Sequence, residues 1–302
     1  MELRELNAFV VIVEEGGMSA ASRRLHVSQS ALSQTVNALE RELGVKLLVR
    51  SSTGVGPTEA GTALLGEARA VLARQAQALR TMANYTNKAS GVIRLGVPLE
   101  PPRGMLPRTL SRFTESRPDA RVVPHYLSSS AQFAALRDGE LDVGLVRERH
   151  AGSEFDAMLV NRETLGVLTT LEVSTKLAGQ HGIPLDALGG MEWVGFPRQD
   201  SPAWYDELTA ILRSHGIDIA LPRQEHELIP AVKLISVGAS GGRAFALAPE
   251  DWPHPRPAHI AWSPLVAHPL IRRTWVVWPA NSRRRDIGHL IAAFEEADIS
   301  DR

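Results

Sequence analysis

The sequence predicts an α/β protein that begins with a winged helix-turn-helix, continues through one long helix, and ends in alternating strands and helices. Three observations support this fold class. Residues 18–43 hold two helical periodicities separated by a short break, residues 58–87 are rich in helix-favouring residues, and short apolar strands alternate with helices beyond residue 90. A chain of 302 residues is long enough for two or three domains.

Two short helices near the amino terminus predict a helix-turn-helix. Ser19 can cap the first, and Ser28 can cap the second after a turn at His26 and Val27. The second helix has apolar residues at the spacing of one helical face: Leu32, Val36, Leu39 and Leu43. Its opposite face carries polar side chains: Ser30, Ser33, Gln34, Asn37 and Arg41. Such a face can touch base edges and phosphates, so this pair of helices is expected to read DNA.

A short hairpin is expected directly after the second helix. Gly44 supplies a helix stop, residues 45–49 can form a strand, and residues 50–56 form a turn-rich tip. This hairpin would be the wing of a winged helix-turn-helix, and the alternative is an ordinary three-helix core with a surface hairpin. A net charge of −1 gives no general attraction to DNA. Affinity must therefore come from a local basic patch, for which the candidates are Arg23, Arg24, Lys46 and Arg50.

The amino-terminal residues resemble the DNA-binding domain of LysR-type transcriptional regulators. The resemblance covers residues 6–9, 18–34 and 39–50, and residues 58–61 resemble the start of that family's linker helix. Residues 136–145 resemble part of the family's effector domain. The resemblance implies a sequence-specific DNA-binding regulator. It also implies a two-lobed, periplasmic-binding-protein-like domain, in which a small-molecule effector between the lobes modulates the geometry on DNA.

The expected DNA contacts fall into two groups. The side chains expected to face the major groove are Gln29, Ser33, Gln34 and Asn37. Of these, Gln34 and Asn37 can form paired amide contacts to adenine. Arg50 and Ser52 should instead hold the DNA backbone. The full predicted set is Arg23, Ser28, Gln29, Ser30, Ser33, Gln34, Asn37, Arg50 and Ser52. Thr53 and Gly54 stand where family members often carry arginine, so one or two phosphate contacts are missing.

A linker helix is predicted next, because the segment is rich in Ala, Leu, Arg, Gln and Glu and lacks proline. Its seam follows the 3-4 spacing of a short coiled coil: Leu65, Ala68, Leu72, Gln75, Leu79 and Met82. Dimerisation is expected through Leu65, Leu72, Leu79 and Met82. The alternative is an amphipathic helix packed on its own domain. The resemblance implies the same homodimer, adds a homotetramer through the effector domains, and makes RNA polymerase a further candidate partner.

The predicted domains are a DNA-binding domain (1–58), a linker helix (59–89) and an effector-binding domain (90–302), with lobe I at about 92–162 plus 266–302 and lobe II at about 163–265. Lobe I should contain a largely parallel sheet with strands at 92–97, 121–127 and 141–146. Strands of lobe II are expected at 165–170, 192–195 and 245–249. A strand at 272–278 and a helix at 286–297 would return to lobe I.

Ligands of open parallel sheets collect at the carboxyl ends of the strands, where loops and helix amino termini converge. Applied to this chain, that rule predicts the effector-binding residues Leu99, Glu100, Ser128, Ser129, Arg147 and Arg198. Glu100 departs from the small hydroxyl residue that the family often carries near this position. With two arginines nearby, Glu100 suggests an effector of mixed polar character. Neutralisation of Glu100 by one of the arginines is equally compatible.

No enzymatic motif is present in the sequence, and the ten histidines lie singly. No catalytic residue, metal site or cofactor is therefore expected, and the absence of cysteine excludes disulfides and thiolate chemistry. No apolar run is long enough to span a bilayer, and no signal peptide is recognisable, so a cytoplasmic protein without membrane contact is expected. The alternatives are a solute-binding protein and a DNA-binding regulator that works without a ligand.

Overall fold

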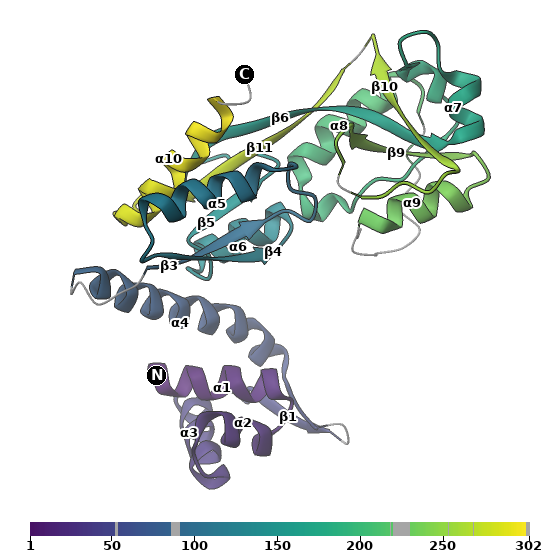
Figure 1. Ribbon diagram of the computed structural model, residues 1–302. Coiled ribbons are helices and arrows are strands. Elements are labelled where there is room, and N and C mark those ends of the chain that lie inside the picture. Colours follow the sequence, from purple (N-terminus) through teal and green to yellow (C-terminus); the bar gives the residue numbers. More distant parts are fainter. Residues whose placement is uncertain are drawn as a thin grey trace. The chain divides into compact units, whose positions relative to one another are not determined.

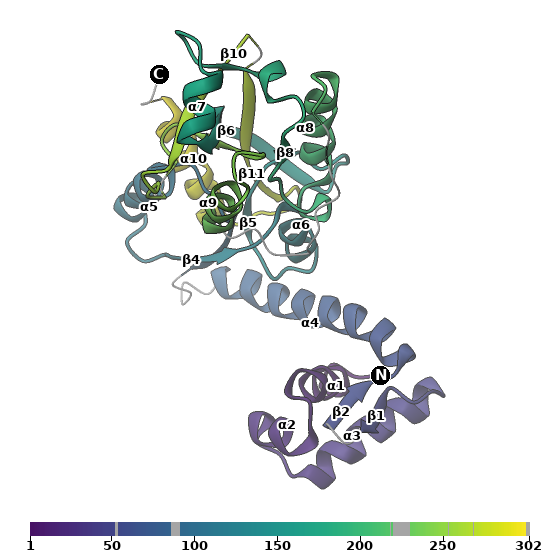
Figure 2. The ribbon, with the colours of Figure 1, turned by 90° about the vertical axis from the view of Figure 1, so that its right-hand side faces the viewer.

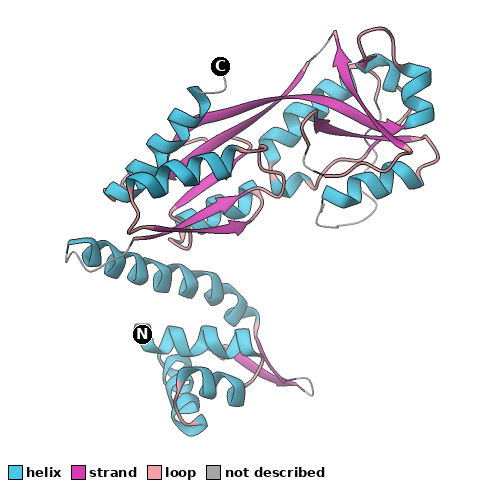
Figure 3. Ribbon diagram, viewed as in Figure 1, coloured by secondary structure: helices cyan, strands magenta, loops and turns pink. Residues whose placement is uncertain are grey.

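The computed structural model describes residues 1–51, 54–85, 91–217, 219, 230–252, 254–267 and 269–299. The chain divides into two compact units, residues 1–89 and most of residues 90–302. The helices and strands of each unit are shown in Figures 1 and 3. None of the described helices combines the length and the apolar character that crossing a membrane requires.

The first unit contains the predicted helix-turn-helix. Its elements are α1 (Leu3–Glu15), α2 (Met18–Leu25), α3 (Gln29–Leu43), β1 (Leu48–Ser51), β2 (Gly54–Pro57) and α4 (Glu59–Tyr85). Ser28 caps α3 as predicted, because its hydroxyl accepts a hydrogen bond from the amide of Ala31 at 3.2 Å. Ser19 does not cap α2. The N-cap is Gly17, and Ser19 lies in the first helical turn.

The wing forms as an antiparallel hairpin of β1 and β2, but its first strand begins three residues later than predicted. The physical reason is the buried carboxylate of Glu40 near the end of α3. Glu40 accepts hydrogen bonds from the amides of Leu47 at 2.9 Å and Leu48 at 3.3 Å, and it pairs with the Lys46 ammonium at 2.6 Å. This carboxylate ties the start of the wing to the end of α3.

The long helix α4 divides its apolar residues between two environments. Leu65 and Leu72 pack against the core formed by α1, the end of α3 and Leu47, where Ala68 is buried. Leu79 and Met82 are 66% and 60% exposed. The amino-terminal half therefore follows the alternative of an amphipathic helix packed on its own domain. The dimer seam through Leu65, Leu72, Leu79 and Met82 stays a prediction, and within one copy Leu65 and Leu72 are partly buried.

The second unit is built on a mixed sheet. Its strands are β3 (Val92–Val97), β4 (Arg121–Tyr126), β5 (Val143–Val146), β6 (Phe155–Thr170), β7 (Ile183–Pro184), β8 (Glu192–Trp193), β9 (Ala244–Pro249), β10 (Ile260–Val266) and β11 (Leu270–Pro279). The strand order is β4-β3-β5-β11-β6-β10-β7, with β9 pairing β6 and β8. The three predicted lobe I strands are parallel. The expectation of a largely parallel sheet is wrong, since β11 pairs antiparallel with β5 and β6, and β6 does so with β9 and β10.

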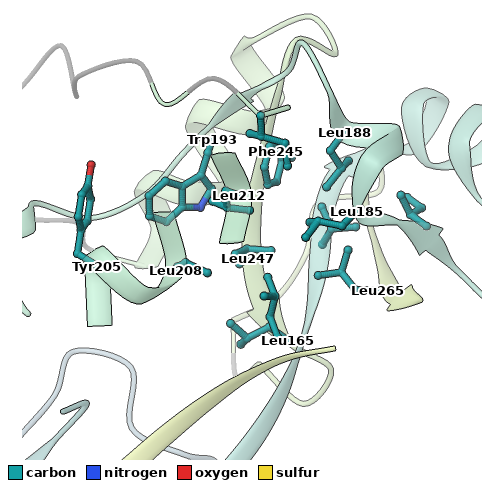
Figure 4. Close-up of a cluster of buried hydrophobic side chains, with 14 of the residues drawn as sticks. Leu165, Leu185, Leu188, Trp193, Tyr205, Leu208, Leu212, Phe245, Leu247 and Leu265 are labelled. Atoms are coloured by element: carbon teal, nitrogen blue, oxygen red, sulfur yellow. The ribbon is translucent and has the colours of Figure 1, made fainter. Parts of the chain in front are cut away.

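Helices cover this sheet around two cores. The α-helices are α5 (Met105–Ser116), α6 (Ser129–Arg137), α7 (Leu171–Leu177), α8 (Pro202–Ser214), α9 (Pro230–Ala239) and α10 (Arg285–Ile299), with 3₁₀ turns at Leu185–Leu188 and Arg198–Asp200. In lobe I, α5 and α10 pack side by side over a cluster that includes Phe113 and Phe294 (Figure 1). In lobe II, α7, α8 and α9 lie around the strands (Figure 2). Figure 4 shows the lobe II core, with Trp193, Leu208 and Phe245.

Two long strands join the lobes. The sequence predicted only residues 165–170 of β6, yet this strand has sixteen residues. Val160 packs in the lobe I core, whereas Leu165 and Val167 pack in the lobe II core. Strand β11 runs antiparallel to residues 155–165 of β6, and Arg272 lies opposite Glu163. The exact residue limits of domains and lobes stay predictions.

Candidate functional site

The polar face of α3 is presented to solvent as the sequence predicted. Gln29, Ser30, Gln34 and Asn37 are exposed, and Ser33 is half-buried between them. Two of these side chains already have partners in the absence of DNA. The Nε2 of Gln29 donates to the hydroxyl of Ser19 at 2.8 Å, and the Nδ2 of Asn37 donates to that of Ser33 at 3.4 Å. The helix thus displays exposed amides at helical spacing, a pattern suited to base edges.

The basic groups around this face are partly neutralised. Arg24 pairs with Glu14 and Glu15, each at 3.0 Å, which leaves Arg23 as the exposed arginine of α2 without such a carboxylate. The Lys46 side chain stays 74% exposed although it pairs with Glu40. The side chain of Arg50 and the whole of Ser52 lie outside the described residues. The predicted patch is therefore weaker than the sequence suggested.

A cavity of about 130 Å³ lies between the two lobes of the second unit. Five of the six predicted effector residues line it: Leu99, Glu100, Ser128, Ser129 and Arg147. They come together because β3, β4 and β5 are parallel, so the segments that follow them meet at one edge of the sheet. Lobe II closes the other side with Trp193, Val194, Gly195, Phe196, Asp200, Ser201, Trp204, Leu208, Lys233 and Leu247.

Arg198 does not line this cavity, so its predicted position in the cleft is wrong. It lies on the 3₁₀ turn that precedes α8, and its side chain is 62% exposed. Its guanidinium makes a two-pronged contact with the carboxylate of Asp206 at 2.8 and 2.7 Å. Asp206 stands on the solvent side of α8 and draws the arginine away from the cavity.

The base of the cavity holds a cluster of buried charges. Arg272 of β11 donates through Nε and Nη2 to both carboxylate oxygens of Glu163 on β6, each at 3.0 Å. Its Nη1 donates to Glu100 at 2.8 Å. Arg147 donates to Glu163 at 3.4 Å and also to the Thr274 hydroxyl and the backbone oxygen of Glu100. Both arginines are therefore engaged by the protein itself.

Lys233 completes the cluster from lobe II. Its Nζ lies 2.7 Å from one carboxylate oxygen of Glu100 and donates to the other at 2.8 Å. Counted in their ionised forms, the three cations and two carboxylates leave one positive charge unbalanced. Of the two interpretations of Glu100, neutralisation by protein cations is the one observed. Lys233 and Arg272 neutralise it.

The charges act strongly on one another because water is excluded. Burial alone would raise the pKa of the Glu100 carboxyl, but Lys233 and Arg272 outweigh it and lower this pKa to about 2. Burial, and after it the charge of Arg272, lowers the pKa of Arg147 to about 9. Burial also lowers the pKa of Lys233, an effect that Glu100 opposes. Glu100 is consequently a carboxylate throughout the physiological pH range.

The lobe II wall is largely apolar but carries two unsatisfied polar groups. The Nε1 of Trp193 and the hydroxyl of Ser201 are buried and have no hydrogen-bond partner among the described residues. Ser201 is the N-cap of α8, yet its side chain caps none of the helix amides. Glu148 of lobe I reaches this end of α8 and accepts from the amide of Trp204 at 2.9 Å. Buried polar groups without partners are unusual, so these two are candidates for ligand contacts.

Sequence reasoning missed Glu163, Arg272, Lys233 and the two unsatisfied groups of lobe II. A signal was present for the first three. Lys233 is the single charged residue of an otherwise apolar helix, and Glu163 and Arg272 stand within strands that carry core residues. A charge in an apolar segment is rarely buried without a partner. No local pattern, however, paired Glu163 with Arg272, because the pairing depends on the strand register.

Family models match both units of the chain. Residues 3–62 match the family model of the bacterial regulatory helix-turn-helix protein, lysR family, and residues 86–298 match that of the LysR substrate binding domain. The HTH-type transcriptional regulator TcbR of Pseudomonas sp. (strain P51) is 33% identical over 261 residues, which cover 84% of this chain and 86% of TcbR. The Escherichia coli (strain K12) protein named uncharacterized HTH-type transcriptional regulator YnfL is 26% identical over 92% of both chains.

A solved structure extends the similarity to the whole chain. The crystal structure of CbnR, a LysR family transcriptional regulator, matches with a TM-score of 0.75 at 25% identity and covers 99% of each chain. The predicted fold class and the family resemblance are both confirmed by these matches. The chain belongs to the LysR family and is a DNA-binding transcriptional regulator with an effector-binding domain.

Proposed function

We propose that the effector of this regulator binds in the cavity between the two lobes. The observation that carries the proposal is the cavity itself, which gathers five separately predicted residues of lobe I against an apolar wall of lobe II. A concave, mostly apolar site with a few convergent polar groups is the usual form of a small-molecule site. The unsatisfied groups of Trp193 and Ser201 add two donors that a ligand acceptor could use.

Binding there would act on the relative position of the lobes. Among the described elements, only β6 and β11 run through both cores. Arg272 of β11 lies opposite Glu163 of β6, and Arg272 lines the cavity. A ligand that contacts both walls favours one arrangement of the lobes over others, and that preference shifts the population. The proposed consequence is a change in the spacing of the DNA-binding domains of the oligomer.

On DNA, we propose that Gln29, Ser33, Gln34 and Asn37 read base edges while Arg23, Ser28, Ser30, Arg50 and Ser52 hold the backbone. The exposed polar face of α3 supports this assignment. Two copies would bind two half-sites through a dimer that uses the exposed part of α4, including Leu79 and Met82. Association of two dimers, contact with RNA polymerase and action in the cytoplasm are proposed on the basis of the family. A catalytic activity is not proposed.

The effector site can be tested on the full chain. A panel of small metabolites is screened by thermal shift, and the affinity of each hit is measured for Ser201→Ala and Trp193→Phe. Both variants remove a polar group that has no hydrogen-bond partner within the described part of the chain, so the fold should be retained. We expect at least one of them to weaken binding about fivefold, the value of one net hydrogen bond.

Matched controls separate the cavity from the rest of the second unit. Thr109→Val and Thr169→Val also remove buried groups without a partner among the described residues, and neither residue lines the cavity. Their affinities should equal that of the unchanged protein. A ligand that binds all four variants with equal affinity would place the effector site elsewhere.

A further inference from the structure

The ion pair of Glu100 and Lys233 joins the two lobes across the cavity. Glu100 follows β3 in lobe I, and Lys233 stands on α9 in lobe II. Their side chains are 11% and 12% exposed, and both line the cavity. The pair thus links lobe I directly to lobe II.

Lys233 differs from the two arginines in how firmly the protein holds it. All three nitrogens of the Arg272 guanidinium donate to carboxylates. Besides Glu100, the Lys233 ammonium has only a backbone oxygen, that of Leu247 at 3.3 Å, and the ring of Trp252 at 5.8 Å. Within the described residues, Glu100 is its single carboxylate partner. Lys233 is therefore the cation that a second anion could reach.

Glu100 would keep a partner if Lys233 were taken from it. Its Oε2 also accepts from Arg272 at 2.8 Å, and that contact lies within lobe I and the strands that join the lobes. The positive charge left unbalanced in the cluster would be compensated by an incoming anion. The exchange therefore leaves no buried carboxylate unpaired, so it avoids the large free-energy cost of an unpaired buried charge.

We propose that Glu100 is an internal competitor for the ligand and that the effector is an anion which takes Lys233 from it. Binding then replaces a direct contact between the lobes by a contact through the ligand. This inference rests on the proposed function and adds the charge of the ligand and the group that the ligand displaces. A cavity of about 130 Å³ is close to the ~150 Å³ that holds benzene in an engineered cavity, so benzoate is a suitable probe.

The test uses the full chain, benzoate and its uncharged analogue benzamide, with calorimetric titration at constant ionic strength. Glu100→Gln removes the competing charge and keeps the shape of the side chain, so benzoate should bind at least tenfold more tightly than to the unchanged protein. Benzamide should bind equally to both. Lys233→Met should weaken benzoate binding at least tenfold. Glu207→Gln is the matched control, since Glu207 forms an exposed ion pair with Arg273 at 3.1 Å.

Each outcome decides the inference. Equal benzoate affinities in Glu100→Gln and the unchanged protein, equal tightening for benzamide, or no detectable benzoate binding by Glu100→Gln would overturn it. If Glu100→Gln unfolds, benzoate or formate should restore its thermal transition and benzamide should not; recovery with neither anion also overturns it. A ligand that depends on Ser201 but on neither Glu100 nor Lys233 would overturn the exchange and leave the proposed cleft intact. A ligand whose affinity is unchanged in all these variants would overturn both the exchange at Lys233 and the proposed effector site in the cavity.

Discussion

Helix α3 exposes Gln34 and Asn37 to solvent. In contrast, the charged cluster beside the cavity is at most 12% exposed, and its members are Glu100, Arg147, Glu163, Lys233 and Arg272. An exposed side-chain amide loses little free energy when its hydrogen-bond partner is water, so it needs no partner within the protein before DNA binds. A buried charge has no such freedom and must be paired within the protein before a ligand arrives. The contrast explains why the charged side chains at the cleft pair with one another, whereas Gln34 and Asn37 of α3 are exposed to solvent.

The largest effect should come from breaking the buried cluster. Glu163→Gln removes the carboxylate that Arg147 and Arg272 share, so we expect a loss of about 3–5 kcal/mol in the stability of the second unit. All six tryptophans lie between residues 193 and 278, so their fluorescence during urea denaturation reports on this unit. The surface control Arg198→Gln should lose far less, because its ion pair with Asp206 is exposed to solvent. Equal losses would show that burial gives the cluster no special role.

The second prediction concerns acid. Because Glu100 has its pKa lowered from 4.5 to about 2, its ionic contacts contribute stability above the unfolded-state value, and this contribution disappears as the pH falls through that window. The shift corresponds to about 3 kcal/mol. The stability difference between the unchanged protein and Glu100→Gln should therefore shrink steadily from pH 5 to pH 2. A difference that stays constant with pH would mean that Glu100 is not held as a carboxylate by Lys233 and Arg272.

The third prediction separates the two halves of α4. Leu79→Glu places a charge on the exposed half, so it should weaken the dimer about a hundredfold and leave the DNA-binding domain folded. Leu72→Glu places the charge against the core that α4 shares with α1, so it should unfold that domain. Light scattering measures the mass, and circular dichroism measures the helix content. An unchanged mass for Leu79→Glu would exclude a dimer through this part of α4.

The same contrast decides how much could be predicted from the sequence. The face of α3 follows from the spacing of residues 32–43 within one helix. The structure buries Leu32, Val36 and Leu39 as expected, but Leu43 in the last turn is 38% exposed. The strand-end rule also located Glu100 and Ser129, because three parallel strands order their own loops. Lys233 and Glu163 could not be found in this way. Their pairing depends on residues more than one hundred positions apart that the fold alone brings together.

The smallest expected effect concerns the open face of α3 and tests whether its amides are available to DNA. Gln34→Ala and Asn37→Ala should each reduce discrimination between operator variants by about 1–3 kcal/mol, because each removes a paired amide contact to adenine. Asn37→Ala should reduce this discrimination more than the exposure of Asn37 suggests, since the side chain is oriented by its contact with Ser33 at 3.4 Å.

Arg23→Gln is the comparison variant. Loss of a backbone contact should weaken binding to all DNA sequences alike and should reduce the dependence of binding on salt. Affinities measured across a panel of single-base operator variants would show the two patterns. If the base preferences of Gln34→Ala and Asn37→Ala match those of the unchanged protein, the amides do not read the sequence. Sequence recognition would then have to come from Gln29 or Ser33, or from DNA shape.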